Sequence, residues 1–358
     1  MIPLHDPQHA QRPTAIALGS FDGLHQGHRR VIAAITTAPG QADHEKAVPT
    51  VVSFWPHPRE VLHGETRLRL DLPAEKLELL EPLGVRQLVL VPFDAQLAAL
   101  SPEAFVEQVL AGSLQARQVA VGDNFRFGAG RRGDVGDLAR LGARHGIAVT
   151  VVPMLHVDGE RVSSSRIRRA LASGAIAEAR HLLQRPYRFS GEVVRGRGLG
   201  RGLGWPTANL RIDGRKFLPQ EGVYACWAWC HAAPEDPVSA PGAASRGHAP
   251  DALPVGRALP AVMNLGPQPT VDPGAASAVE VHLLDLPAQG ETDLTGAWLT
   301  VEPVQRLRGQ IRFASLDELS ARISADAAAA RAQLPQEVIT GASPALAITA
   351  RLAGEGAT

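Results

Sequence analysis

The chain has 358 residues, of which 45% are hydrophobic, and its 36 basic side chains balance 36 acidic ones. This length predicts two domains. The balanced charge argues against nucleic acid or an anionic membrane as a partner. Two cysteines are too few for a disulfide framework, and no apolar stretch reaches the roughly 20 residues that span a bilayer. We therefore expect a cytoplasmic protein; whether it forms a homo-oligomer stays open.

In the first half, short apolar runs alternate with segments of helical periodicity. Strands that alternate with helices predict a parallel sheet with helices on both faces. The predicted strands are 14–18, 50–54, 87–92, 118–121 and 147–153. The predicted helices are 28–35, 74–80, 102–110, 136–142 and, interrupted at Ser173-Gly174, 164–183.

After Pro186 the pattern becomes β-rich. Runs at 223–229, 261–265, 279–284 and 298–304 predict an antiparallel barrel or sandwich, and 315–331 predicts a closing helix that Ser315 caps. The Ala-, Pro-, Gly- and Ser-rich segment 232–259 predicts a disordered insertion, and 336–358 a flexible tail. The predicted domains are therefore 1–184 and 185–335.

The segment GSFDGLHQGH, from Gly19 to His28, carries the first chemical signal. It follows a predicted strand and opens a predicted helix, where free backbone N–H groups and the helix dipole favour a phosphate. Gly19 and Gly23 permit a tight turn and the close approach of a ligand. His25 and His28 are three residues apart and share one face of the first helical turn. Their imidazoles can donate hydrogen bonds to phosphate oxygens in a transition state.

Two alternative sites fit this segment less well. A zinc site is weaker because the two histidines lack a third ligand nearby. A Walker A loop is excluded because the chain has three lysines, and none of them is followed by Ser or Thr.

The segment resembles the HxGH signature of nucleotidyltransferases, in the form used by the bacterial bifunctional riboflavin kinase/FAD synthetase family. Three later segments strengthen this resemblance: 54–58 is similar to the PHP loop, 121–128 to a glycine–aromatic loop, and 162–168 to an ISSTxIR element. Ser165 replaces the usual threonine and keeps the hydroxyl. The resemblance implies a Rossmann-like α/β domain that adenylylates FMN with ATP and releases pyrophosphate.

The resemblance also implies roles for individual residues of this domain. His57 and Asn124 would contact the flavin, although His57 between two prolines is equally compatible with a rigid turn. Asp22 would either orient the turn or act through a metal ion. The implied catalytic residues are His25, His28 and Arg168. The implied ATP- and phosphate-binding residues are Gly19, Ser20, Phe21, Asp22, Gly23, Gly27, Ser163 and Ser164.

The second chemical signal is the segment 196–209, in which glycines alternate with arginines before the run Pro206-Thr207-Ala208-Asn209. A flexible Gly-rich loop flanked by fixed positive charge can crowd a phosphate. Thr207 and Asn209 offer a hydroxyl and an amide oxygen, which are ligands that Mg²⁺ prefers. A solvated basic linker and an RNA-binding Gly/Arg tract are the alternatives.

This run resembles the PTAN signature of riboflavin kinase, and further motifs of that enzyme follow in order at 218–224, 264–270, 279–282 and 307–313. The resemblance implies a β-barrel domain that phosphorylates riboflavin to FMN. Glu280 would be the general base, and Thr207 and Asn209 would bind Mg²⁺. Gly198, Gly200 and Pro206 would bind ATP. Arg308 would contact the flavin or a phosphate.

Three residues depart from the family pattern: this chain has Gln268 where the family usually has Arg, Thr295 where it has Tyr, and Gln310 where it has Glu. Two alternative functions are kept. One is a single-activity HxGH cytidylyl- or adenylyltransferase whose β domain only senses flavin. The other is a flavin- or RNA-binding regulator on a degenerate scaffold. Cys226 and Cys230, four residues apart in a predicted strand, are expected to be buried rather than to hold a metal.

Overall fold

A computed structural model of the chain describes residues 2–37, 47–196, 207–231, 257–266, 279–284, 294–311 and 313–334. The chain divides into two compact units, Met1–Ser164 and Ser165–Thr358. The predicted boundary near residue 184 stays a prediction. Most of the predicted insertion 232–259 and the predicted tail 336–358 lie outside the described residues, as do Gln268, Gly198, Gly200 and Pro206.

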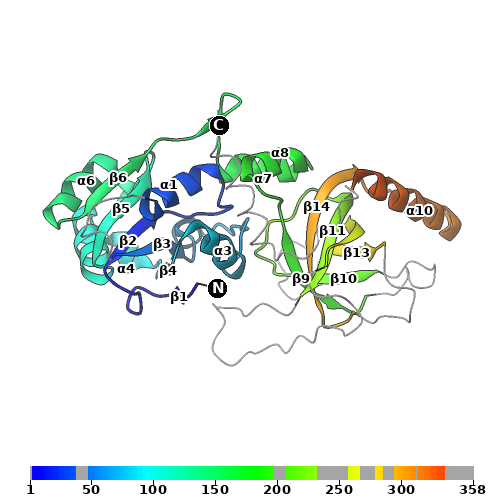
Figure 1. The fold of residues 1–358 in the computed structure, drawn as a ribbon, viewed down its shortest axis with the longest axis horizontal. Coiled ribbons are helices and arrows are strands. Elements are labelled where there is room, and N and C mark those ends of the chain that lie inside the picture. Colours follow the sequence, from blue (N-terminus) through cyan, green and yellow to red (C-terminus); the bar gives the residue numbers. More distant parts are fainter. Residues whose placement is uncertain are drawn as a thin grey trace. The chain divides into compact units, whose positions relative to one another are not determined.

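The first unit is an α/β domain whose sheet, within the described residues, has six parallel strands in the order β1-β4-β3-β2-β5-β6 (Figure 1). These strands are β1 Leu4–His5, β2 Thr14–Leu18, β3 Val48–Trp55, β4 Gln87–Pro92, β5 Ala116–Gly122 and β6 Ala148–Val152. The alternation of apolar strands and helices in the sequence correctly predicts this arrangement.

Helices connect the strands of this sheet. They are α1 Gln26–Thr36, α2 Pro58–His63, α3 Pro73–Leu80, α4 Ala95–Ala99, α5 Pro102–Ala104, the π-helix η2 Phe105–Ser113 and α6 Val135–Arg144, with short 3₁₀ turns η1 Glu81–Leu83 and η3 Ala129–Arg131. A two-stranded hairpin, β7 His156–Val157 and β8 Glu160–Arg161, precedes the end of the unit. The single helix expected over 102–110 is instead divided between α5 and η2.

The central strand β2 explains why the site lies where it does. All five of its residues are buried, because the strand has neighbours on both edges and packing on both faces. Ile16 and Leu18 pack in one hydrophobic cluster, and Ala15 and Ala17 pack in the other, as the period of two requires. The chain leaves the carboxyl end of this buried strand as the loop 19–25, which is where open α/β sheets place ligands.

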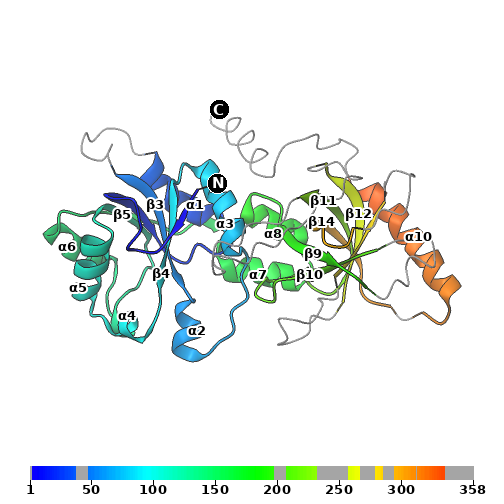
Figure 2. The same cartoon turned by 90° about the horizontal axis from the view of Figure 1, so that it is seen from below.

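The second unit contains a closed antiparallel barrel in the order β10-β13-β12-β11-β14-β9 (Figure 2). Its strands are β9 Phe189–Val194, β10 Ala208–Ile212, β11 Gly222–His231, β12 Leu259–Leu265, β13 Val279–Leu283 and β14 Trp298–Arg308. Helices α7 Ser164–Ala172 and α8 Ile176–Leu183 precede the barrel. The barrel, one of the two architectures predicted, confirms the β-rich expectation.

Strand β9 was not predicted, because Gly191 interrupts its apolar pattern. The structure gives the reason for this glycine: a Cβ at position 191 would lie 2.7 Å from the backbone oxygen of Arg211 on the neighbouring strand. Close approach of two backbones therefore requires glycine within a regular strand.

The predicted closing helix is α10, Leu316–Gln333, and the Ser315 hydroxyl caps it by accepting the N–H of Glu318. Ala330 at its end and Leu334 beyond it pack with Trp227 of β11. The helix is also held by Asp326, which is buried and accepts hydrogen bonds from the Arg308 guanidinium.

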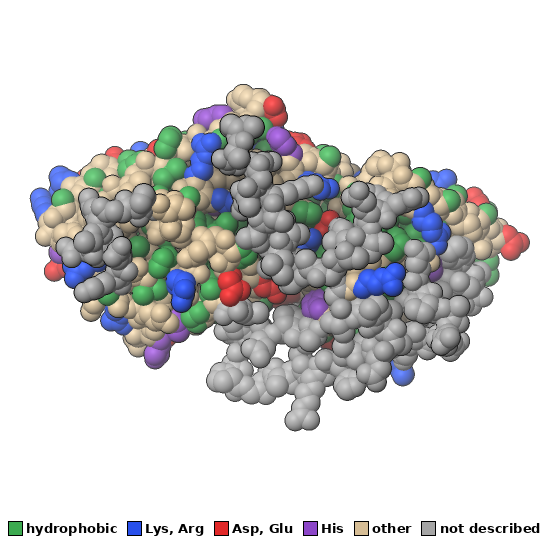
Figure 3. All heavy atoms as spheres, viewed as in Figure 1, with side chains coloured by type: hydrophobic (Ala, Val, Ile, Leu, Met, Phe, Trp, Pro, Cys, Tyr) green, Lys and Arg blue, Asp and Glu red, His purple; other side chains and the backbone are tan. Residues whose placement is uncertain are grey.

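Several composition-based expectations can be compared with this fold. Cys226 and Cys230 are free and buried, as predicted, and burial raises the pKa of Cys230 to about 11. No helix in the described part of the chain is long and apolar enough to cross a membrane. On the face drawn in Figure 3, basic side chains are spread over several places with acidic ones among them, in agreement with the balanced charge.

Candidate active sites

His25 ends the loop that follows β2 and caps helix α1. Its Nδ1 accepts a hydrogen bond from the backbone N–H of His28 at 3.3 Å. An accepting Nδ1 carries no hydrogen, so Nε2 is the protonated nitrogen of the neutral ring and remains a donor. The local fold therefore determines the tautomer that the predicted phosphate chemistry needs.

The His25 and His28 rings are stacked, with centroids 3.6 Å apart. Burial, and next the nearby Arg161 cation, lower the pKa of His25 to about 4. Burial and the neighbouring His25 hold the pKa of His28 well below its usual value. Both rings are thus neutral at pH 7. Nδ1 of His28 is buried and has no hydrogen-bond partner within the described residues, so this atom can serve a ligand.

Gly27 packs closely against the His25 ring. A Cβ at position 27 would lie 3.2 Å from Cε1 and 3.3 Å from Nδ1 of His25. Such contacts are tighter than most Cβ contacts in proteins, so a larger residue would shift the His25 ring by a few tenths of an ångström. The position of the His25 ring therefore gives a structural reason for the glycine of the HxGH-like segment.

The loop between β2 and α1 has an unusual backbone. Phe21 and Leu24 adopt positive φ angles of 44° and 41°, which are rare for residues other than glycine, and Gly23 has φ 92°. Asp22 anchors this shape: its Oδ1 accepts the backbone N–H groups of Leu70 at 2.8 Å and Asp71 at 3.3 Å. These bonds favour the orienting role for Asp22, one of its two predicted alternatives.

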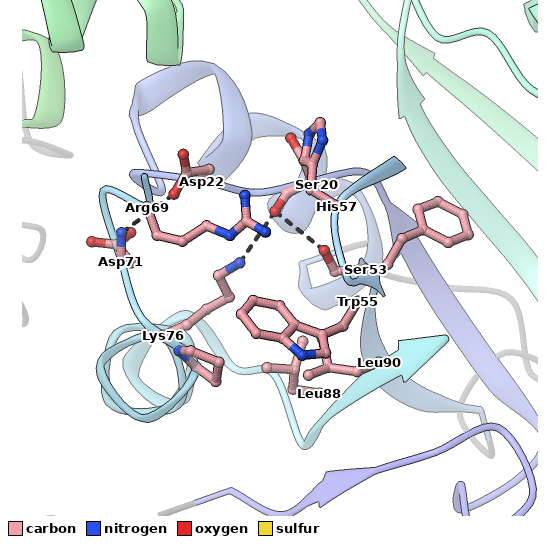
Figure 4. Close-up of a pocket in the computed structure, with 12 residues that line it drawn as sticks. Ser20, Asp22, Ser53, Trp55, His57, Arg69, Asp71, Lys76, Leu88 and Leu90 are labelled. Atoms are coloured by element: carbon pink, nitrogen blue, oxygen red, sulfur yellow. Dashed lines mark hydrogen bonds between the residues drawn. The ribbon is translucent and has the colours of Figure 1, made fainter. Parts of the chain in front are cut away.

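Further contacts hold the same loop from outside it. The Ser164 hydroxyl donates to the backbone oxygen of Asp22 at 2.7 Å. Lys76 Nζ and the Ser53 hydroxyl donate to the backbone oxygen of Ser20, at 3.1 and 3.2 Å (Figure 4). Strain in a loop persists only when its surroundings hold it in place, and these bonds supply that support.

Lys76 was missed by the sequence analysis. It is buried on α3, and burial lowers its pKa while the Asp22 and Asp71 carboxylates oppose that shift. The signal was present: α3 buries Pro73, Lys76, Leu77 and Leu80, a helical stripe in which Lys76 is the charged member. A lysine in an otherwise apolar stripe needs a partner, and here that partner is the loop.

Lys76 belongs to a pocket beside the loop, where Arg69 and Lys76 both point toward Ser20 (Figure 4). Arg69 is paired with Glu60 at 2.5 Å and lies 5.0 Å over the Trp55 ring. The pocket is lined by Ser20, Asp22, Ser53, Phe54, Trp55, His57, Arg69, Asp71, Pro73, Lys76, Leu88 and Leu90.

His57 lies in this pocket and also begins α2. Its Nδ1 accepts the N–H of Arg59 at 3.1 Å, and Glu60 accepts the N–H of His57 at 2.8 Å. This capping box supports the rigid-turn interpretation. Its contact with flavin stays a prediction.

The sheet order brings other predicted residues to the same edge. The His57 loop follows β3 and the Asn124 turn follows β5, and these two strands flank β2. Asn124 is exposed. Ser163 precedes α7. Arg168 lies on α7 in the second unit, where its guanidinium carbon is 5.9 Å from the Phe217 ring centre; its predicted role at the phosphates stays a prediction.

In the barrel, Glu280 lies at the centre of a polar row. Asn209 of β10 and Asn264 of β12 are directly opposite it on the two strands that flank β13. All three are half-buried and share the outer face of the barrel. Their neighbours along the strands are buried in its interior: Ala208, Leu210, Met263, Leu265, Val279 and Val281.

The oxygen donors of this row fit a magnesium ion. Thr207 lies two residues before Asn209, which is paired with Glu280 in the strand register. Mg²⁺ binds through few protein oxygens and keeps water and substrate phosphates as its other ligands. Asn209 is also crowded by the Gly-rich segment, because a Cβ on Gly196 would collide with its side-chain amide.

Arg308 has a partner that the sequence did not predict. Its guanidinium binds both oxygens of the Asp326 carboxylate of α10: Nη2 donates to Oδ2 at 2.6 Å and Nε to Oδ1 at 3.1 Å. This bidentate pair connects the end of β14 to the closing helix. The predicted contact of Arg308 with flavin stays a prediction.

Comparisons with known proteins agree with both halves of the chain. A family model of FAD synthetase matches residues 7–166, and one of riboflavin kinase matches residues 183–334. A solved structure from Streptococcus pneumoniae, described as a macrolide-efflux protein, superposes with a TM-score of 0.73 at 26% identity and covers 92% of this chain and 98% of its own.

Relatives match along most of their length. The bifunctional riboflavin kinase/FMN adenylyltransferase of Escherichia coli (strain K12) is 36% identical over 327 residues, which cover 90% of this chain and 94% of the relative. That of Pseudomonas fluorescens is 36% identical over 331 residues, covering 92% and 96%. That of Bacillus subtilis (strain 168) is 31% identical over 330 residues, covering 90% and 93%. The chain therefore belongs to the family of bifunctional riboflavin kinase/FMN adenylyltransferases.

Proposed function

We infer that the chain carries both activities of its family, and that each unit holds one of them. It is a transferase that uses ATP to phosphorylate riboflavin to FMN and then to adenylylate FMN to FAD. The observation that supports this division is the match of FAD synthetase to the part with the stacked histidines and of riboflavin kinase to the part with the Glu280 row.

In the kinase reaction, Glu280 takes the proton from the riboflavin 5′-hydroxyl. The hydroxyl oxygen forms a bond to the γ-phosphorus of ATP, the bond from that phosphorus to the bridging oxygen breaks, and ADP leaves. Thr207 and Asn209 would hold Mg²⁺, which would neutralise phosphate charge. Glu280 is half-buried, so part of its side chain is accessible to the substrates.

In the adenylyl transfer, a phosphate oxygen of FMN bonds to the α-phosphorus of ATP and pyrophosphate leaves. The attacking oxygen carries no proton that must be removed, so this site needs positioning and charge stabilisation rather than a base. Neutral imidazoles suit that task, because the protonated Nε2 of His25 donates to a phosphate oxygen without a change of charge.

The test incubates the pure protein with riboflavin, ATP and Mg²⁺ and separates the flavins. We expect FMN to form first and FAD to follow. FMN without FAD would contradict adenylyl transfer, and FAD formed only from added FMN would support the alternative of a single-activity nucleotidyltransferase with a flavin-sensing barrel. Tight flavin binding without turnover would support the regulator.

A further inference from the structure

Helix α10 is attached to the barrel through the second half of its length. Its buried residues are Asp326, Ala327 and Ala330, and no residue from Leu316 to Ala325, all of them described, is buried. Ala330 packs in a hydrophobic cluster with Trp227 of β11. Counted from the start of the helix, Asp326 is therefore the first residue that fixes α10 to the barrel.

A nearly buried ion pair makes this attachment. The Asp326 side chain is 6% exposed and the Arg308 side chain 12%. The guanidinium donates from Nη2 and Nε to the two carboxylate oxygens, at 2.6 and 3.1 Å, and its Nη1 donates to the backbone oxygen of Gly309 at 3.0 Å. All three nitrogens of Arg308 thus have partners within the protein, which favours a connecting role for this side chain.

Arg308 also belongs to the row that contains Glu280. It is opposite Val223 of β11, Val223 is opposite Asn264 of β12, and Asn264 is opposite Glu280 of β13. Residues directly opposite one another project from the same face of a sheet. Arg308 is therefore on the outer face of the barrel, three strand spacings or roughly 14 Å from Glu280.

The order of this row separates the two substrates of the kinase reaction. Asn209, the proposed magnesium ligand, flanks Glu280 on the β10 side, so ATP belongs on that side. The riboflavin hydroxyl must reach the same carboxylate, which leaves the β12 side, toward α10, for the rest of the flavin. On α10, the half-buried Leu319 and Ile323 share one helix face with Asp326 and offer apolar side chains there.

We propose that Arg308 and Asp326 are positioning residues for riboflavin phosphorylation: their ion pair holds the first half of α10 in place as an apolar wall beside the flavin. The proposal rests on the proposed function, because it takes Glu280 as the base and Asn209 as a magnesium ligand. Neither residue of the pair touches the substrate; both act through α10. Such a wall contacts the flavin equally in the ground state and the transition state, so its loss should raise KM for riboflavin and leave kcat nearly unchanged.

The experiment is a double-mutant cycle of Arg308→Met and Asp326→Leu on the full-length protein, with FMN formation as the readout. Each single substitution leaves the other charge without its partner, and we expect KM for riboflavin to rise about tenfold, with KM for ATP unchanged. The double variant replaces the ion pair with two apolar side chains that still pack helix against strand. It should therefore recover most of the lost affinity for riboflavin.

Arg322→Met is the matched control. Arg322 binds the same carboxylate at 3.3 Å but lies on α10 itself, so it does not connect the helix to the barrel, and its loss should leave KM for riboflavin unchanged. Hydrogen exchange of the amides from Ser320 to Ala325 gives a readout that does not depend on turnover. It should become faster in each single variant and return toward the wild-type rate in the double variant.

Two results would overturn the proposal. One is an unchanged KM for riboflavin in both single variants. The other is a double variant with the full defect of Arg308→Met beside a nearly normal Asp326→Leu, which would assign Arg308 to direct substrate contact. Asp326→Asn, a milder change, should show a smaller rise in KM and replaces the leucine variant if that protein does not fold.

The proposed function can fail separately from this proposal. A wild-type protein that forms no FMN, or a Glu280→Gln variant that still forms it, contradicts the proposed function. The exchange rates of α10 still show in that case whether the ion pair holds the helix.

Discussion

The two sites of this chain are built in contrasting ways. The stacked histidines follow a loop with two non-glycine residues at positive φ, which is held by bonds from residues 33 to 142 positions away in sequence. The Glu280 row instead lies on regular strands, where register alone aligns its members. His25 is buried, whereas His28 is half-buried, as are the members of the row on the outer face of the barrel.

This difference teaches where each site is vulnerable. The loop site depends on supporting side chains outside the reacting groups, so remote substitutions should damage it. The barrel site depends on the few residues that face the substrates, because strand hydrogen bonds maintain the backbone without them. Because one chain carries both sites, each activity serves as the folding control for the other.

The largest expected effect is the loss of Glu280, the proposed base in the barrel. Glu280→Gln keeps the size and the hydrogen-bonding capacity of the side chain but cannot take a proton, so kcat for FMN formation should fall about thousandfold. FAD formation from added FMN, measured on the same sample, should be unchanged. A variant that retains more than a tenth of the kinase activity would contradict the assignment.

The corresponding change at the loop site is His28→Ala. Removing this imidazole takes away the phosphate contact proposed for it, and FAD formation should fall by roughly a hundredfold to a thousandfold. FMN formation from riboflavin should continue at the wild-type rate. If both activities fall together, the two sites are not independent, and the contrast between them is wrong.

A pH effect on stability should appear in the first unit. The pKa of His25 is about 4 in the folded protein against about 6.5 when exposed, so the unfolded chain binds the proton more tightly. Stability is therefore complete above pH 6.5 and decreases as the pH falls from 6.5 toward 4, by roughly 3 kcal/mol from His25.

Hydrogen exchange of the β2 amides in urea measures the free energy of unfolding of that unit separately. The matched control is His25→Asn, which keeps an acceptor for the His28 N–H but has no group that titrates in this range. Its pH dependence should be weaker than that of the wild type. An equal pH dependence in both proteins would show that His25 is not its source.

Most of the fold could be predicted because its signals are local. The strand expected at 14–18 has those bounds in the structure. The glycines and histidines that follow it correctly indicate a turn and then the start of a helix. The parallel sheet followed from strand–helix alternation. Strand β9 could not be predicted, because Gly191 interrupts its apolar pattern. The reason for this glycine is the close approach of the Arg211 backbone on β10, which lies 20 residues later in the sequence.

The supports of the sites could not be predicted in the same way. Lys76 contacts Ser20 across 56 positions, and Gln310 contacts Asn264 across 46. The periodicity of a single sequence does not show which polar side chains far apart in the sequence form hydrogen bonds with each other. The resemblance named Glu280 and the histidines, but the contacts around them were found only when the fold placed the residues side by side.

Lys76→Met gives the smallest effect and the sharpest test of the contrast. Methionine fills the space but donates no hydrogen bond to the Ser20 oxygen, so the strained loop loses one of its supports, and FAD formation should fall about tenfold. Lys216→Met is the matched control, because Lys216 is an equally buried lysine of the second unit, 5.0 Å from the Tyr187 ring centre. It should leave FAD formation from added FMN unchanged. If Lys76→Met also leaves FAD formation unchanged, the contacts of Ser53, Asp22 and Ser164 are sufficient to hold the loop. The loop site would then depend on fewer remote side chains than the hydrogen bonds indicate.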